Sequence, residues 1–204
     1  MQYKASDIVQ LTWDDIQKYV EKIHADVQEY LEKNKLEIDV IVPILRGGAI
    51  PGTMLAFMFN NVRILPVQQK YFIHDGKLVM KRMLTTNFSN LVDFNKTKPV
   101  ILVVEGNHST GEIAKTAVNK IRKQMPDSTI IYVSLTRDYA FKDSVRADFI
   151  TQGVYTNENR KLSKEECKQL KIPFEKIRIF PWESKKEEFA GLNKTSFSYK
   201  HEPR

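Results

Sequence analysis

Two glycine-bearing turns, each following an apolar run, are the parts of this chain best suited to chemistry. The first contains Arg46, Gly47 and Gly48, and the second extends from Glu105 to Gly111. A segment with helical periodicity follows each turn, so several backbone N–H groups and the positive end of a helix dipole converge at one point. Phosphate oxygens accept hydrogen bonds from such N–H groups. The two turns therefore predict an anion-binding site.

Periodicity predicts the elements that must position these turns. Apolar runs at 39–43, 62–68, 100–104, 129–135, 149–155 and 177–183 indicate buried strands, and helical spacing covers 14–33, 49–60, 110–124 and 163–170. Thr12 and Asp15 have the spacing of a capping box before the first of these helices. Alternating strands and helices favour a parallel α/β sheet, which binds ligands at the carboxyl ends of its strands. Both turns fall at that edge.

The segment 69–97 interrupts the alternation. An Asp-Gly pair between two apolar stretches predicts a β-hairpin, which carries the basic residues Lys77, Lys81 and Arg82. A basic hairpin beside an anion site could close over the ligand as a lid, or it could be a solvated hairpin, and the sequence leaves both readings open. We expect one domain over residues 1–183 with the hairpin as an insertion, followed by a polar tail at 184–204.

The composition is that of an ordinary globular protein, with 42% hydrophobic and 28% charged residues. A net charge of +7 favours anionic ligands, but the basic residues are dispersed and do not separate a nucleotide enzyme from a nucleic-acid binder. The single cysteine, Cys167, excludes an internal disulfide and provides no metal-ligand spacing. No apolar run approaches the roughly 20 residues of a membrane helix, and the first residues lack a signal-peptide layout. We therefore expect a cytoplasmic protein without a membrane partner.

Three segments in combination resemble the type I phosphoribosyltransferases, in particular the xanthine-guanine and hypoxanthine-guanine enzymes. Residues 45–52 resemble the loop that holds pyrophosphate, 103–111 the loop that binds phosphoribosyl pyrophosphate (PRPP), and 179–183 the segment beside the purine. The resemblance covers about residues 11–183. It implies an α/β fold with a central, mainly parallel sheet flanked by helices, and with the β-hairpin as a hood or lid.

The resemblance also implies roles for individual residues. The residues expected at the 5′-phosphate are Ser109, Thr110, Gly111 and Glu112. Those expected at pyrophosphate are Arg46, Gly47 and Gly48. Those expected near the base are Arg137, Arg178, Ile179, Phe180 and Trp182, of which Trp182 is expected to pack on the core. Family members use Mg²⁺, which bridges pyrophosphate and the ribose hydroxyls, and Glu105 is the residue expected to orient that metal.

The second turn departs from the family pattern at two positions. Gly106 replaces the second of two adjacent acids that bind the ribose hydroxyls, which leaves Glu105 alone. Ser109 replaces an Asp that accepts a proton near the base, and a hydroxyl cannot hold that proton at neutral pH. His108 titrates in the right range and could take over this role, or it could be exposed in a loop that no longer catalyses. The catalytic candidates are therefore Glu105, His108 and Ser109.

Two functions follow from these residues. The first is transfer of the 5-phosphoribosyl group between PRPP and a purine or purine-like base with release of pyrophosphate, using Mg²⁺ as cofactor. The second is a catalytically weak regulator that binds a nucleotide or, less favoured, a nucleic acid. Related proteins are often dimers, and the sequence does not decide whether this chain forms a homodimer.

The missing acid suggests a direct test of the degenerate PRPP loop. Since a second carboxylate would restore the ribose contacts, we expect Gly106→Asp to raise the affinity for PRPP, measured by isothermal titration. A fall in affinity with retained folding would indicate a loop adapted to another ligand.

Overall fold

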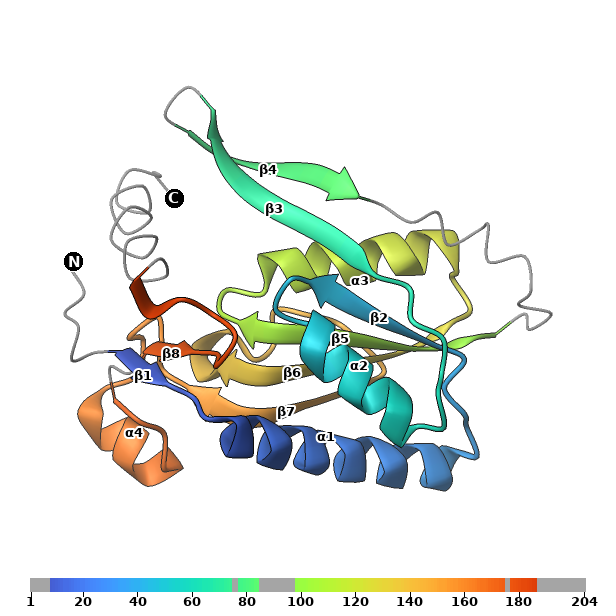
Figure 1. The fold of residues 1–204 in the computed structure, drawn as a ribbon, viewed down its shortest axis with the longest axis horizontal. Coiled ribbons are helices and arrows are strands. Elements are labelled where there is room, and N and C mark those ends of the chain that lie inside the picture. The colour runs from blue at the N-terminus through green and yellow to red at the C-terminus, as the bar shows by residue number, and fades with distance from the viewer. Residues whose placement is uncertain (1–7, 75–76, 85–97, 175–176, 187–204) are drawn as a thin grey trace.

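The computed structural model describes residues 8–74, 77–84, 98–174 and 177–186, and for residues 69–74 and 77–84 it describes the backbone alone (Figure 1). The helices are α1 (Trp13–Asn34), α2 (Ala49–Met58), α3 (Glu112–Gln124) and α4 (Lys164–Leu170). The strands are β1 (Ile8–Gln10), β2 (Val40–Leu45), β3 (Val67–His74), β4 (Lys77–Leu84), β5 (Val100–His108), β6 (Thr129–Asp138), β7 (Phe149–Thr156) and β8 (Ile177–Ile179).

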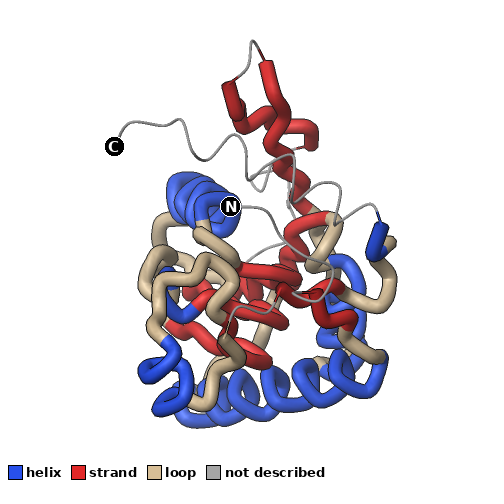
Figure 2. The backbone as a smooth tube through the Cα atoms, turned by 90° about the vertical axis from the view of Figure 1, so that its left-hand side faces the viewer, coloured by secondary structure: helices blue, strands red, loops and turns tan. Residues whose placement is uncertain are grey.

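The central sheet has the strand order β4-β3-β2-β5-β6-β7. Strands β3, β2, β5, β6 and β7 are parallel, and β4 runs antiparallel to β3. Helices α1 and α2 cover one face of the sheet and α3 covers the other (Figures 1 and 2). The expected α/β architecture with a mainly parallel sheet and a β-hairpin is therefore confirmed.

Strand β5 lies at the centre of the sheet and is buried on both faces. Leu102 and Val104 pack in the cluster under α1 and α2, whereas Ile101 and Val103 pack in the cluster under α3. Side chains alternate along a strand, which explains why a strand buried on both faces is continuously apolar. The alternation directs the next residue, Glu105, toward the α3 face.

The structure corrects the expected bounds of several strands. Strand β6 continues to Asp138, and β8 ends at Ile179 instead of residue 183. Strand β5 extends to His108, because its pairing with β6 continues through Asn107 and His108, so residues 105–108 belong to the strand rather than to the turn. Strand β3 begins at Val67 instead of residue 62, and the earlier Ile64 makes only an isolated bridge to Ile41. One continuous strand therefore joins the sheet to the hairpin.

A second, two-stranded sheet lies beyond the carboxyl ends of the central strands. Strand β1 pairs in parallel with β8, with Ile8 opposite Ile177 (Figure 1). The β3–β4 hairpin also extends past that edge, whereas the side chains of Lys77, Lys81 and Arg82 and the segment 85–97 lie outside the described part, so the lid stays a prediction. The proposed tail is undescribed from residue 187 onward.

Two further expectations from the sequence concern the single cysteine and membrane-spanning helices. The thiol of Cys167 is free and buried. In the described part of the chain, no helix has both the length and the apolar character needed to span a bilayer.

The capping box at the start of α1 provides a test of the fold. The Thr12 hydroxyl accepts a hydrogen bond from the Asp15 N–H at 3.1 Å, and the Thr12 N–H donates to the Asp15 carboxylate at 2.9 Å. We expect Thr12→Ala to lower the free energy of unfolding by about 1 kcal/mol, measured by chemical denaturation. Thr116→Ala, inside α3, is the matched control and should cost no stability, because Ala is the better helix former. Equal losses in both variants would contradict the cap.

Candidate functional site

The two glycine-bearing turns lie side by side at the carboxyl edge of the sheet, because each follows one of two neighbouring strands. The 46–48 turn follows β2, and the 109–111 turn follows β5. The backbone of the first turn contacts β5 just before the second turn: a Cβ added to Gly106 would lie 2.8 Å from the carbonyl carbon and oxygen of Gly47. Only glycine allows this approach at Gly106, and the contact fixes the spacing between the turns.

The 109–111 turn opens onto the amino terminus of α3. Gly111 is the N-cap residue with φ +80°, in the left-handed region that favours glycine, and it provides no side-chain hydrogen bond to the first turn of the helix. The first N–H groups of a helix have no partner within the helix, so here they can bind an anion. Arg46 is exposed on the neighbouring turn. The arrangement can hold two anionic groups.

Glu112 is the first residue of α3 and an exposed one. Its carboxylate lies 3.9 Å from Lys115 Nζ, and the side chains of both residues are about half exposed. Solvent and Lys115 therefore screen much of the repulsion that a bound phosphate would feel from this carboxylate.

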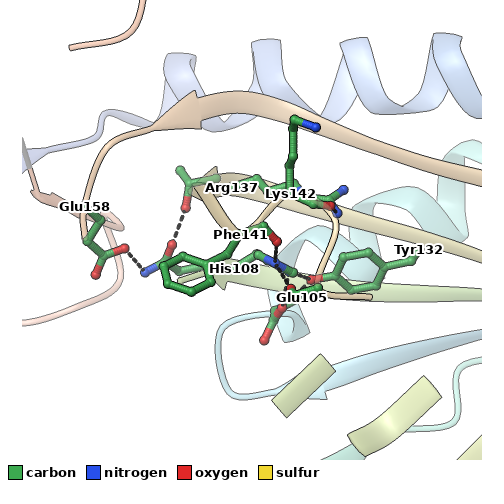
Figure 3. Close-up of polar contacts among 10 residues, drawn as sticks. Glu105, His108, Tyr132, Arg137, Phe141, Lys142 and Glu158 are labelled. Atoms are coloured by element: carbon green, nitrogen blue, oxygen red, sulfur yellow. Dashed lines mark hydrogen bonds and ion pairs between the residues drawn. The ribbon is translucent and has the colours of Figure 1, made fainter. Parts of the chain in front are cut away.

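Glu105 does not face the space between the turns. Its side chain is turned into the α3 face of the sheet, where the Tyr132 hydroxyl is hydrogen-bonded to its Oε2 atom (Figure 3). Burial raises the pKa of this carboxyl to about 7, although the hydrogen bond from Tyr132 and the charge of Arg137 oppose the rise. The Glu105 carboxyl is thus engaged by Tyr132, and its expected role toward the ribose and a metal stays a prediction.

The side chains present do not fit a metal ion held by the protein. Gly106 offers no donor, and the Glu105 carboxyl is occupied by Tyr132. Among the described residues, no group of three or more His, Cys, Asp or Glu side chains has a metal-binding arrangement. A Mg²⁺ ion that arrives bound to PRPP would be part of the substrate.

His108 is also placed beneath the turn instead of on its surface. Its ring is 0% exposed, with Nδ1 2.7 Å from the Tyr132 hydroxyl and Nε2 3.1 Å from the Phe141 carbonyl oxygen and 2.9 Å from Ser144 Oγ (Figure 3). Burial and then the charge of Arg137 lower its pKa to about 4. The ring is therefore buried and not exposed on the loop, and its expected role as proton acceptor near the base stays a prediction.

Ser109 is held at the surface of the site by a neighbouring loop. Asn159 Nδ2 donates to Ser109 Oγ at 3.0 Å, and the backbone N–H of Asn159 donates to Asp138 at 2.7 Å. The Asp138 carboxylate also accepts the N–H of Ala140 at 3.0 Å. These contacts connect the 109–111 turn to the loops that follow β6 and β7.

A small pocket lies between β8 and the carboxyl ends of β5 and β7. Its walls comprise Asn107, Glu158, Ile177, Arg178, Ile179, Phe180 and Glu183. The Thr136 hydroxyl donates to Asn107 Oδ1 at 2.9 Å, and Asn107 Nδ2 donates to Glu158 at 2.9 Å (Figure 3). Sequence reasoning did not select Asn107 or Glu158 as base contacts, although Glu158 follows a strand at the edge where ligands bind.

The residues expected near the base separate into two groups. Arg178, Ile179 and Phe180 line the pocket, and Phe180 is only 2% exposed because its ring stacks on Trp182 at 4.7 Å. Trp182 is half-buried against the core, as expected. Arg137 lies elsewhere: its guanidinium is buried beside Tyr132 and donates to the Lys142 carbonyl. Arg137 does not line this pocket, and its expected contact with the base stays a prediction.

Solved structures place this arrangement among known folds. A purine phosphoribosyltransferase from Pyrococcus horikoshii shares 18% identity with the chain at a TM-score of 0.61, over 87% of this chain and 95% of the other. The chain has the type I phosphoribosyltransferase fold. The xanthine-guanine-hypoxanthine phosphoribosyltransferase of Helicobacter pylori has a TM-score of 0.56 and 15% identity, over 90% of this chain and 99% of that one. The resemblance inferred from the sequence is confirmed for the fold.

A third structure with this fold is a hypothetical protein from Neisseria gonorrhoeae with bound ppGpp. It matches at a TM-score of 0.64 and 15% identity, over 93% of this chain and 97% of the other. No protein-family model and no curated protein sequence matches the chain.

The contact between Gly47 and Gly106 reverses the expected effect of restoring an acid. A side chain at residue 106 meets the Gly47 backbone, so Gly106→Asp should lower PRPP affinity instead of raising it.

For the fold alone we expect Gly106→Ala to cost about 1–3 kcal/mol of unfolding free energy, measured by denaturation. Gly47→Ala is the matched control, since its Cβ would lie 3.4 Å from the nearest atom. An equal cost in the two variants would refute the contact.

Proposed function

We propose that the carboxyl edge of the sheet binds PRPP, with the 5′-phosphate at the 109–111 turn and the pyrophosphate at the 46–48 turn. The observation that supports this proposal is the backbone contact between Gly47 and Gly106, which sets the 46–48 turn against the strand that leads into the 109–111 turn. PRPP has a phosphate at one end of a ribose and a pyrophosphate at the other, so it matches a pair of such turns. Arg46 adds a fixed positive charge at the pyrophosphate side.

The reaction that suits this arrangement is transfer of the phosphoribosyl group to a purine or purine-like base. Arg46 and the N–H groups of Gly47 and Gly48 would neutralise the departing pyrophosphate, and the turn ending at Gly111 would hold the 5′-phosphate. Catalysis would consist mainly of positioning the base against the sugar. In this proposal the protein supplies binding and orientation, and any Mg²⁺ is carried by PRPP.

The base would bind in the pocket between β8 and β5. Ile179 and Phe180 supply its apolar wall, and Asn107 and Glu158 supply polar groups for the edge of a base. Burial, followed by the nearby charges of Asp138 and Glu183, raises the pKa of the Glu158 carboxyl, and the hydrogen bond from Asn107 opposes that rise. A carboxyl with a raised pKa at the base pocket is a better candidate proton acceptor than Ser109.

A second function, a nucleotide-binding regulator, is favoured by one specific observation. The carboxylate pair that would face the ribose is reduced to Glu105, which is turned inward against Tyr132. The neighbour from Neisseria gonorrhoeae carries ppGpp, a guanine nucleotide that has a pyrophosphate on its ribose. Such a ligand could use the same two turns without any transfer. A nucleic-acid binder would not need paired turns, so that alternative is not favoured.

The primary test combines binding and turnover. PRPP is titrated into the protein by calorimetry with and without Mg²⁺, and mixtures with guanine, hypoxanthine, xanthine or adenine are assayed for released pyrophosphate. Binding followed by pyrophosphate release supports the transferase, and binding without release supports the regulator, for which ppGpp is titrated next. Absence of binding by PRPP, pyrophosphate and ppGpp would refute both functions.

Arg46→Ala tests the pyrophosphate turn within the same assay. Since Arg46 is exposed, its loss should leave folding unchanged while lowering PRPP affinity by about tenfold or more, as expected for a charged hydrogen-bonding partner. Arg146→Ala is the matched control, because Arg146 is exposed just before β7, at the opposite edge of the sheet. Unchanged affinity in Arg46→Ala, or an equal loss in both variants, would contradict the assignment.

A further inference from the structure

The loop that follows β7 is joined to β5 and to the 109–111 turn by two consecutive side chains. Glu158 accepts a hydrogen bond from Asn107 Nδ2 at 2.9 Å, and Asn159 Nδ2 donates to Ser109 Oγ at 3.0 Å. Asn107 and Ser109 are alternate residues of the segment that leads into α3. The loop therefore holds this segment at two points, one in the base pocket and one at the phosphate turn.

The same loop keeps its own shape through Asn157, which is fully buried. Asn157 Oδ1 accepts the Leu162 N–H at 3.0 Å, and Asn157 Nδ2 donates to the Leu162 carbonyl oxygen at 3.2 Å. The Asn157 carbonyl oxygen also accepts the Arg160 N–H at 3.0 Å. Asn159 thus extends from a closed loop, and a side chain held in this way is in place before a ligand arrives.

Asp138 decides which way the Asn159 amide faces. Asp138 is 0% exposed at the end of β6, where one of its carboxylate oxygens accepts the Ala140 N–H at 3.0 Å. The other oxygen accepts the Asn159 backbone N–H at 2.7 Å and lies 3.2 Å from Asn159 Nδ2. With the amide turned over, two oxygen atoms would lie 3.2 Å apart, and an ionised carboxylate has no hydrogen to place between them. The amide nitrogen therefore faces both Asp138 and Ser109.

The hydrogen bonds to Asp138 also act on its ionisation. Burial raises the pKa of the Asp138 carboxyl, and the N–H groups of Asn159 and Ala140 oppose that rise. Hydrogen bonds to a carboxylate favour its charged form, in which both oxygens can only accept.

The direction of the amide determines what Ser109 can offer a ligand. An amide nitrogen does not accept hydrogen bonds, so the Ser109 hydroxyl hydrogen takes no part in the contact with Asn159. Among the described residues, Ser109 Oγ has no other hydrogen-bond partner, and the residue is only half-buried. Its hydrogen is therefore left for a group that binds at the turn. Phosphate oxygens only accept hydrogen bonds at neutral pH, so this is the polarity that a phosphate needs.

We propose that Asn159 is a positioning residue for the 5′-phosphate, which acts by leaving the Ser109 hydroxyl hydrogen free to donate to the ligand. Asp138 supports this role by fixing the Asn159 amide. The proposal rests on the proposed function, which places the 5′-phosphate at the 109–111 turn. Because Asn159 acts through Ser109, it should matter for ligands with a 5′-phosphate and only while residue 109 has a hydroxyl.

The first experiment compares two probes by calorimetry. PRPP has a 5′-phosphate, whereas inorganic pyrophosphate represents only the group assigned to the 46–48 turn. Asn159→Ala should lower PRPP affinity about fivefold and leave pyrophosphate affinity within about twofold. Asn119→Ala, at an exposed residue of α3, is the matched control and should keep both affinities. Normal PRPP affinity in Asn159→Ala, or an equal loss for pyrophosphate, would overturn the positioning role.

A double-mutant cycle separates positioning from a structural effect. Ser109→Ala removes the hydroxyl and should itself lower PRPP affinity about tenfold, as expected for a hydrogen bond to a charged group. In that background Asn159→Ala should cost less than about twofold, because the group that it positions is gone. A similar loss in both backgrounds would show that Asn159 acts without Ser109 and would overturn the proposal, as would full PRPP affinity in Ser109→Ala.

Asn159→Asp tests the orientation of the amide while keeping the shape of the side chain. A carboxylate can only accept from Ser109, so it would draw the hydroxyl hydrogen away from the ligand. The added negative charge repels phosphate in any background, and Asn159→Asp combined with Ser109→Ala measures that repulsion alone. We expect the loss of PRPP affinity from Asn159→Asp to be about fivefold larger when Ser109 is present. Equal losses in the two backgrounds would overturn the role of the hydroxyl.

The outcomes also distinguish this proposal from the function on which it rests. Circular dichroism and thermal unfolding confirm that each variant is folded, and Asn159→Asp, which preserves the side-chain shape, replaces Asn159→Ala if the latter is not. If the wild type binds neither PRPP nor pyrophosphate, the proposed function fails and the positioning role fails with it. If the wild type binds both and folded Asn159 variants bind PRPP normally, the positioning role fails alone.

Discussion

The close approach of the Gly47 and Gly106 backbones is the constraint on which the candidate site depends. It requires the carboxyl ends of β2 and β5 to meet without any side chain at residue 106. The same contact removes the position from which a second carboxylate would reach a ribose. An acidic side chain at residue 106 would therefore have to displace the Gly47 backbone.

The direction of Glu105 follows from the strand that carries it. Because β5 is extended through His108, alternation sends Glu105 to the α3 face, where Tyr132 of β6 is its partner. A lone carboxylate buried there would be costly, and the hydrogen bond from Tyr132 reduces that cost. Glu105 and His108, which the sequence placed in an open loop facing a ligand, thus lie beneath the 109–111 turn and support it.

Much of the fold and part of the site could be predicted from the sequence, because those signals are local. Residues close together in the chain determine the buried strands, the Thr12 cap and both glycine turns. The order of the three segments that resemble the family then indicated the fold. Strand β1 was missed because three residues carry too little periodicity. Tyr132 was missed because in the sequence it continues an apolar strand pattern. The role of its hydroxyl appears only in the fold, where it lies against His108 of the neighbouring strand β5. Glu158 is brought to the site by pairing distant in sequence.

The placement of charge bears on the choice between a transferase and a regulator. Arg46 and the α3 amino terminus would attract the two anionic ends of PRPP, but Glu105 is turned away from the ribose between them. Attraction at the 5′-phosphate acts on substrate and transition state alike, and attraction at the pyrophosphate grows as that group departs, whereas stabilising the cationic sugar of the transition state needs negative charge near its centre. Uniform binding lowers the dissociation constant without raising the rate of transfer. Under the proposed function, this arrangement predicts slow turnover unless Glu158 or the base itself supplies negative charge near the sugar.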